Sequence, residues 1–461
     1  MEDEKSKPRK VRLSRCYRLF LFSIMASIEG AMNIANGILS SVSKEIKKSL
    51  NMSYAKFGSF GTANSLGRII SSTLFGMLNQ KISRKWSTTL GIGFHAIFIL
   101  IFQATNNANI LIFVWGLHGF TQMPLSIYVP IWIDQYAIRS YRTVQLTTVQ
   151  LSQTIGKCIG YLLNMYFGLE HWKKGFLVEA GYLIFCTICC LITSENYFSL
   201  TLYRPKLSDE EEKNIWISCT IYEEQEKPKN KKEEKRNFFD DLKILGGHSL
   251  YVLSVTCRCI LHGINTCLHF WLADFLRTVI HEQNQLKITI YYSIICFAGP
   301  VGGMIANAVL KPFIISYESR KASWPLVILQ LIASIFGICI GFMKTTLNVT
   351  IATILFLIFN SSALPIVQGI LISCVDKELG ATGFAIANIL TQVLTSGTTP
   401  LLYGVINDRY KDKISNLAML CIMSLEFLAI PFLCILAYLR NKKFDEEEKN
   451  KEDKEQELVD K

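Results

Sequence analysis

Polar side chains recur at helical spacing inside the longest apolar stretches of this sequence. Glu29, Asn33 and Asn36 are spaced i, i+4 and i+7, which places all three on one face of a helix. A carboxylate on such a face exchanges a proton with its surroundings, and amides bind polar groups. The stripe is therefore a candidate site for ligand binding and proton coupling.

Three other apolar stretches carry stripes of the same kind. Their members are Gln150, Gln153 and Lys157; Arg258, His262, Asn265 and His269; and Asn388, Gln392, Thr395 and Thr399. Two further stretches contain His118, Gln122, Asn360 and Gln368. Two explanations are open for the amides and hydroxyls, since such groups bind ligands in some membrane proteins and join helices by hydrogen bonds in others.

The ionisable members of these stripes require water or a partner. A charge at the centre of a membrane-spanning helix costs about 2.5 to 3.5 kcal/mol. If Glu29, Lys157 and Arg258 share a cavity, the two cations can hold an anionic or zwitterionic head group while the acid exchanges a proton. Arg68, Glu179 and Glu426 are also ionisable and lie within apolar stretches. For the two glutamates we favour a helix contact, or a side chain that extends to the membrane interface, over a role in binding.

The stretches themselves have the length of membrane-spanning helices, because about 20 apolar residues cross the roughly 30 Å hydrocarbon core of a bilayer. The sequence contains six on each side of a charged segment. We expect helices near residues 16–40, 55–78, 86–105, 109–133, 144–168, 172–194, 249–275, 287–311, 323–344, 350–373, 380–406 and 415–440. The fold predicted is an all-α membrane protein with twelve transmembrane helices in two pseudo-symmetric bundles.

Composition supports this interpretation. Of 461 residues 50% are hydrophobic and only 18% are charged, which is too apolar for ordinary soluble domains. The net charge of +11 lies mostly in the tails and alternate loops, as expected for cytoplasmic segments rather than for nucleic-acid binding. The lipid bilayer is the expected partner of a monomer with both termini in the cytoplasm. Most cysteines fall inside apolar stretches, so we predict no disulfide framework, metal site or cofactor.

The expected domain organisation follows the charged segment. It comprises a basic cytoplasmic tail at 1–14, a six-helix bundle at 15–194, a charged cytoplasmic linker at 195–247, a second six-helix bundle at 248–440 and a disordered cytoplasmic tail at 441–461. The stripes fall on equivalent helices of the two halves. This arrangement is typical of transporters whose halves enclose a polar site at mid-membrane.

A loop motif resembles a known family. The segment from Gly76 to Lys85 is similar to G-x-L-x-D-[RK]-x-G-[RK]-[RK] of the major facilitator superfamily. The matching residues are Gly76, Leu78, Lys81, Arg84 and Lys85. Gln80 and Ser83 replace the family's acid and second glycine, and Trp115 replaces the arginine of its R-x-x-x-G motif. The resemblance implies a weaker cytoplasmic latch and a departure from the family's commonest route of proton coupling.

Other segments resemble the Spinster-like branch of that superfamily. They are Tyr128-Val-Pro-Ile-Trp-Ile-Asp134-Gln-Tyr136 followed by Arg142, the segment from Asp241 to Trp271, and Pro400-Leu-Leu-Tyr-Gly-Val-Ile-Asn-Asp408. We expect Asp134 and Arg142, like Gly76, Lys81, Arg84 and Lys85 in the loop motif, to lie in loops that gate the transporter. The resemblance implies that Glu29 matches the branch's coupling acid, with sphingolipids or lysophospholipids as cargo. It also implies a lysosome-like or vacuole-like membrane, with the plasma membrane as the alternative.

We therefore expect a secondary transporter that works by alternating access and is coupled to protons. One alternative is a facilitator of small polar solutes such as sugars, amino acids or organic anions. Another is a transport-dead receptor or scaffold, which the changes at Gln80 and Trp115 allow. An enzyme is not expected, because the sequence contains no nucleophile and base set, metal cluster or nucleotide loop.

Overall fold

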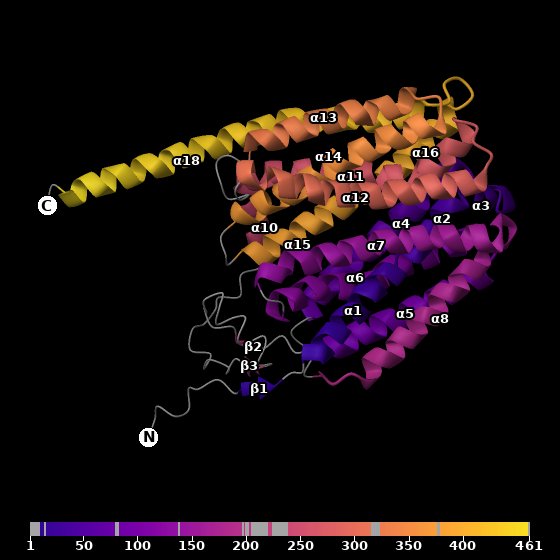
Figure 1. Ribbon diagram of the computed structural model, residues 1–461, viewed down its shortest axis with the longest axis horizontal. Coiled ribbons are helices and arrows are strands. Elements are labelled where there is room, and N and C mark those ends of the chain that lie inside the picture. The colour runs from indigo at the N-terminus through magenta and orange to yellow at the C-terminus, as the bar shows by residue number, and fades with distance from the viewer. Residues whose placement is uncertain are drawn as a thin grey trace. The chain divides into compact units, whose positions relative to one another are not determined.

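A computed structural model describes residues 10–12, 15–78, 83–136, 139–195, 198, 202–203, 220–223, 238–314, 323–375 and 379–459. These residues are mainly helical (Figure 1). The chain divides into two compact units, the first formed by Met1–Val42 and Leu66–Lys235 and the second by Ser43–Ser65 and Arg236–Lys461. Helix α4 (Tyr54–Leu78) contributes its first half to the second unit and its second half to the first.

The first unit is a helical bundle with a small sheet. Its helices are α1 (Arg15–Ala31), α2 (Ile34–Ser41), α5 (Arg84–Ala104), α6 (Ala108–Tyr136), α7 (Arg139–Phe167), η2 (Leu169–His171) and α8 (Lys173–Ile192). Helix α5 packs between α6 and α8, and α7 packs on α1 and α2. Strands β1 (Lys10–Arg12), β2 (Leu202–Tyr203) and β3 (Thr220–Glu223) pair antiparallel in the order β1-β3-β2, with Val11 opposite Ile221. The sequence did not predict this sheet, because its strands are only two to four residues long, too short for a clear alternating pattern.

The second unit contains the remaining helices. They are α3 (Ser43–Ser49), α10 (Phe238–Gly247), α11 (Ser249–Thr278), α12 (Gln285–Ile314), α13 (Ser323–Phe342), α14 (Thr346–Ser373), α15 (Gly380–Thr391), the π-helix η5 (Gln392–Ser396), α16 (Thr399–Tyr410), α17 (Leu417–Ser424), η6 (Leu425–Leu428) and α18 (Ala429–Val459). Helix α14 packs on α11, α12 and α13. A cluster of buried apolar side chains from α11, α13, α14 and α18 forms the core.

The helices have the properties of membrane spans. Within the described residues nine helical segments are long and apolar enough to cross a bilayer. Three more helices of spanning length, α4, α7 and α11, contain 25, 29 and 30 residues and fall on predicted spans. Polar and charged residues make these three less apolar. The prediction of a multi-pass, all-α membrane protein is confirmed.

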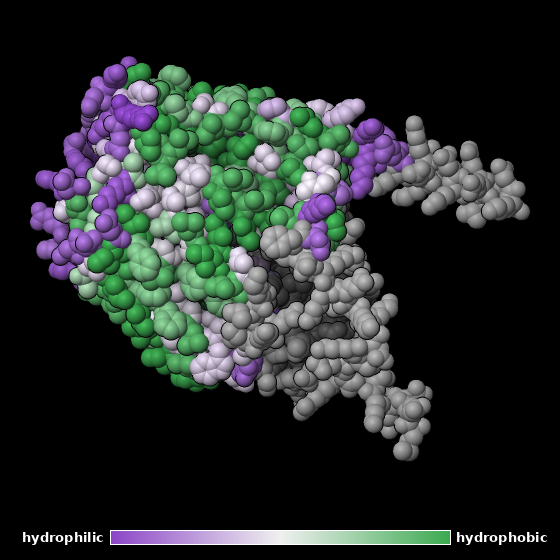
Figure 2. Space-filling view, turned by 180° about the vertical axis from the view of Figure 1, so that it is seen from behind, coloured by the Kyte–Doolittle hydropathy of each residue, from purple (hydrophilic) through white to green (hydrophobic). Residues whose placement is uncertain are grey.

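The exterior of the bundles is apolar. On α5 the exposed residues Leu90, Phe94, Ile97 and Ile101 recur once per helical turn and form a continuous stripe. In Figure 2 apolar residues cover most of the coloured surface, while hydrophilic residues gather mainly at the left and in a smaller group at the upper right. Surface of this kind is stable against lipid and unfavourable against water, since apolar area costs about 25 cal/mol per Å² when hydrated.

The carboxyl tail differs from the expectation. The sequence predicted a disordered tail at 441–461, whereas α18 continues as a helix to Val459 (Figure 1). The segment is rich in Lys and Glu, which are strong helix formers. Lys442 and Glu446, one turn apart, are 3.9 Å from each other, and such pairs each add about 0.2–0.5 kcal/mol of helix stability.

Candidate functional site

A polar cluster in the first unit surrounds Glu29. The carboxylate lies in the last turn of α1 and is 2% exposed. Gln153 on α7 donates a hydrogen bond of 2.9 Å from Nε2 to Oε2 of Glu29, and Ser126 also faces the carboxylate. The predicted stripes of the first and fifth apolar stretches are therefore brought together.

The first predicted span is interrupted beside this carboxylate. Helix α1 ends at Ala31 and α2 begins at Ile34, which leaves backbone groups that need other partners. Asn33 donates from Nδ2 to the carbonyl oxygen of Glu29 at 2.9 Å, and Gln122 donates from Nε2 to that of Met32 at 2.7 Å. Two of the predicted site residues thus stabilise the break. Discontinuous helices of this type form binding sites in secondary transporters.

Close helix contact positions the cluster. A Cβ atom on Gly156 would lie 1.9 Å from the carbonyl oxygen of Gly30, and one on Gly160 would lie 2.3 Å from that of Ile34. Only glycine therefore allows α7 to approach the break so closely. Lys157 is half-buried on the same helix, four residues beyond Gln153.

Arg68 belongs to this cluster, although sequence reasoning did not place it in the site. Its guanidinium donates to the side-chain oxygen of Gln122, whose nitrogen is bonded to the helix break. Arg68 is isolated in the sequence and forms no stripe, so only its position inside an expected membrane-spanning helix hinted at a membrane location.

A second polar cluster lies in the second unit, between α11 and α15. Arg258 donates from Nη2 to Oδ1 of Asn388 at 2.6 Å. His262 lies one turn further along α11, with Nδ1 3.3 Å from the hydroxyl oxygen of Ser396. Asn265 on α11 and Gln392, directly after the end of α15, are half-buried. These predicted residues are thus gathered within one unit.

The backbone is irregular at this cluster as well. Gln392 starts the π-helix η5, and the Gly397 N–H donates to the Gln392 carbonyl oxygen at 3.1 Å. Single π-turns inside α-helices often mark functional sites. Thr399 donates from its hydroxyl to the carbonyl oxygen of Gly263 at 2.9 Å, so the irregular segment is fixed to α11.

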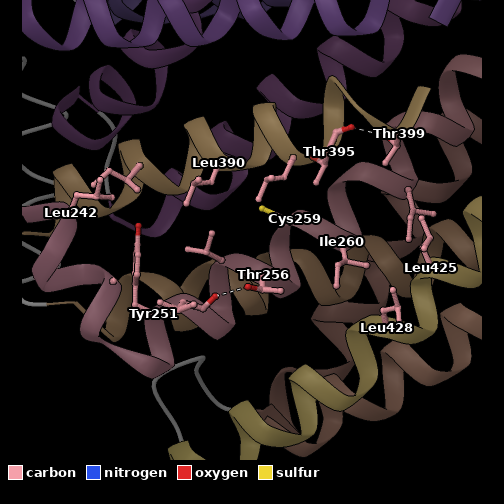
Figure 3. Close-up of a pocket in the computed structure, with 16 residues that line it drawn as sticks. Leu242, Tyr251, Thr256, Cys259, Ile260, Leu390, Thr395, Thr399, Leu425 and Leu428 are labelled. Carbon is pink, nitrogen blue, oxygen red and sulfur yellow. Dashed lines mark hydrogen bonds between the residues drawn. The ribbon is translucent and has the colours of Figure 1, made fainter. Parts of the chain in front are cut away.

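An apolar pocket lies beside this cluster (Figure 3). Its volume is about 360 Å³, and its walls come from α10, α11, α15, η5, α16 and η6. Apolar side chains dominate the lining, including Val255, Ile264, Leu390, Leu394 and Leu428. Leu394 and Leu428 are 57% and 52% exposed. The pocket is therefore open to the surface at these two leucines.

A buried ion pair connects α3 to α11 in the second unit. Lys47 Nζ lies 2.8 Å from Oδ1 of Asp274, whose side chain is fully buried. The Lys47 ammonium is also 3.3 Å from the centre of the Tyr54 ring, which adds a cation–π contact. Burial lowers the pKa of Lys47, and the charge of Asp274 opposes this shift.

Two residues of the Spinster-like segments support this ion pair. Trp271 donates from Nε1 to the Pro400 carbonyl oxygen at 3.0 Å. Asp408 accepts the backbone N–H groups of Tyr54 and Ala55 at 2.8 and 2.7 Å, and so caps the start of α4. We define the Lys47 cluster as Lys47, Asp274, Tyr54, Trp271 and Asp408.

The predicted gating residues are partly described. Arg84 and Lys85 begin α5, and Lys85 donates from Nζ to the Leu191 carbonyl oxygen at 2.9 Å, near the end of α8. Cations are favourable at this end of a helix. Gly76 lies in α4, while Lys81 lies outside the described residues. Asp134 and Arg142 lie within α6 and α7, but their side chains are outside the description.

His118 lies against aromatic side chains, and the charge of Arg68 in the Glu29 cluster also acts on it. Its ring stacks on Trp115 with centroids 4.4 Å apart and lies 4.3 Å from the ring of His95. It thus belongs to a group of buried side chains on α5, α6 and α8, and its predicted role in binding stays a prediction.

Comparisons with known proteins agree with this architecture. The family model of the major facilitator superfamily matches residues 21–400. The structure is similar to that of a bacterial homologue of the human lysosomal transporter Spinster in an inward-facing, unoccupied conformation. The TM-score is 0.73 and the sequence identity is 14%, and the match covers 93% of this chain and 99% of that chain. The nucleoside transporter NupG is similar with a TM-score of 0.63, 12% identity and coverage of 93% and 98%. No curated protein matches the sequence. Because the sequence identities are this low, the structural similarity is evidence for a shared fold and not for a shared cargo.

Proposed function

This chain belongs to the major facilitator superfamily, and from that premise we propose that it is a secondary transporter that moves an amphiphilic solute and is coupled to protons through Glu29. In such transporters the cargo site lies near the midplane and becomes accessible from each side of the membrane in turn. The proposal assigns the proton to the Glu29 cluster, and the cargo to the polar cluster and pocket of the second unit.

The surroundings of Glu29 carry the proposal. The carboxylate is buried at a helix break and is held by the amide of Gln153. An amide contains both a donor and an acceptor, so it can pair with a carboxylate or, after rotation, with a carboxylic acid. The site can therefore hold Glu29 in either protonation state, which a coupling group requires. The resemblance to the Spinster-like branch implies the same role.

The pocket beside α11 supports an amphiphilic cargo. Its lining is almost entirely apolar, which suits an acyl chain. Arg258, one residue before the pocket-lining Cys259, supplies a cation for an anionic or zwitterionic head group. Leu394 and Leu428 at the surface provide a route by which a chain can enter from lipid.

The test is uptake into proteoliposomes of a labelled lysophospholipid, driven by an inward proton gradient. We expect Glu29→Gln to abolish the gradient-driven accumulation, because the amide cannot carry a proton across. The matched control is Glu426→Gln, which alters another buried carboxylate held by a glutamine, Gln330, in the second unit. Equal accumulation by Glu29→Gln and the wild-type protein, with both folded, would contradict the coupling role.

A second candidate function is transport of a small polar solute. The similarity to the nucleoside transporter NupG favours it, because that transporter has the same fold. The amides of the two polar clusters, including Asn388, can bind sugar hydroxyls or a base. A labelled nucleoside offered in the same assay distinguishes the two cargoes.

A further inference from the structure

Three buried side chains with metal-ligating atoms meet inside the first unit. His95 on α5, His118 on α6 and Glu179 on α8 each direct one such atom to a common region, and these atoms all lie within 4.8 Å of one another. The residues are 0%, 1% and 0% exposed. Burial of so many polar groups in a membrane span requires a compensating interaction.

The hydrogen bonds of Thr121 assign the protonation of His95. The Thr121 hydroxyl lies 3.0 Å from the His118 carbonyl oxygen and 3.2 Å from that of Leu117, so either carbonyl can accept its single hydrogen. The hydroxyl also lies 2.8 Å from Nδ1 of His95, and when its hydrogen is donated to the backbone it accepts a hydrogen bond from that nitrogen. Neutral His95 is then protonated on Nδ1, and its Nε2 carries a lone pair.

That lone pair faces a carboxylate. Nε2 of His95 lies 3.8 Å from Oε1 of Glu179, which is too long for a direct hydrogen bond. Within the described part of the chain, neither this nitrogen nor either oxygen of Glu179 has a hydrogen bond of normal geometry. The N–H of Ala35 in the first turn of α2 faces Glu179 without completing one. Two electron-pair donors thus face each other in a buried site, which a bridging cation would satisfy.

The ligands are also held in orientation. A hydrogen bond at Nδ1 leaves Nε2 of His95 free to bind a metal. Metal-bound imidazoles usually donate their other ring N–H to a neighbouring oxygen in this way. Trp115 stacks on His118 with an interplanar angle of 5°, which limits rotation of that ring. Because His95, His118 and Glu179 come from three helices, a shared ligand would join α5, α6 and α8.

We propose that His95, His118 and Glu179 bind one divalent transition-metal ion, with zinc as the representative, and that this ion stabilises the first unit. Two imidazoles and one carboxylate form a recurrent zinc ligand set that leaves one coordination position for water. Ligands bound at about 2.1 Å are separated by at most about 4.2 Å, so the widest pair must approach by roughly half an ångström. Side-chain rotation is sufficient for a movement of this size.

The experiment measures metal content of the full chain carrying an affinity tag without histidine. Purified protein in detergent is stripped with a chelator, reloaded with Zn²⁺ or Co²⁺, passed through a desalting column and analysed by mass spectrometry of the metal. The variants are His95→Gln and Glu179→Gln. The controls are His171→Gln, which removes an exposed histidine, and Glu426→Gln, which removes a buried carboxylate elsewhere.

We expect roughly one ion per chain in the wild-type protein and both controls, and a loss of affinity of at least about a hundredfold in the two ligand variants. Thr121→Val should weaken affinity about 10- to 100-fold by releasing His95. The melting temperature of the wild-type protein should rise with Zn²⁺ concentration. Absence of bound ion from the reloaded wild-type protein would overturn the proposal, as would equal retention in Glu179→Gln. If a variant does not fold, the amount of metal retained by the reloaded wild-type protein decides whether the site exists.

Discussion

The residues of the candidate site differ in how readily they could be predicted from the sequence. Glu29, Asn33 and Gln122 were predicted because each is a polar residue in an otherwise apolar stretch. Their partners were harder to find, since Gln153 is 124 positions from Glu29 and no local pattern pairs them. Residues on separate helices become neighbours only through packing, which spacing along one helix does not encode.

The group of His95, His118 and Glu179 illustrates the same limit. The sequence predicted no metal site, because these three residues lie on separate helices and lack the short spacings of known metal motifs. His118 was assigned to the predicted binding stripe from its helix alone. Its ring contacts His95 and Trp115, and the charge of Arg68 also acts on it, none of which its own helix could indicate.

The Lys47 cluster allows a prediction at the scale of one ion pair. We expect Lys47→Met to destabilise the protein by about 3–5 kcal/mol, because Asp274 would remain buried without its cation. Thermal unfolding in detergent measures the effect. The double variant Lys47→Met with Asp274→Asn should be more stable than the sum of the two single variants predicts, since it buries no unpaired charge. Strictly additive effects would contradict a direct interaction.

At the scale of helices, the positions of the spans followed from length and apolarity, whereas their irregularities did not. No proline marks the break at Asn33 or the π-helix that begins at Gln392. Both irregularities depend on partners in other helices, namely Gln122 for the break and Gly263 for the segment after η5. The helical tail was missed for a different reason, because high charge was taken to indicate disorder.

The packing of α7 against the break makes a prediction at this scale. Gly156→Val should destabilise the first unit by about 1–3 kcal/mol or more, since its Cβ would lie 1.9 Å from the Gly30 carbonyl oxygen and the helices would have to separate. The control is Gly181→Ala on α8, where an added Cβ meets no atom within 4 Å. Melting temperatures in detergent test this. If both variants melt together with the wild-type protein, the close contact is incorrect.

At the scale of the whole molecule, the sequence was sufficient for the family and the class of fold. Apolar stretches and the loop from Gly76 to Lys85 indicated it, and the family model confirms it over residues 21–400. Cargo is a different matter. Under the proposed function it depends on the shape and lining of a pocket built from six helical segments, and this property has no signature in a single sequence.

The most direct test of the account is transport by the wild-type protein in proteoliposomes. A labelled lysophospholipid and a labelled nucleoside are offered separately, each with and without an inward proton gradient. We predict accumulation of the lysophospholipid that the gradient increases and a protonophore removes. Accumulation of the nucleoside alone would indicate that the site binds a polar cargo. If the folded protein moves neither compound, the claim that it is a transporter of either cargo is contradicted.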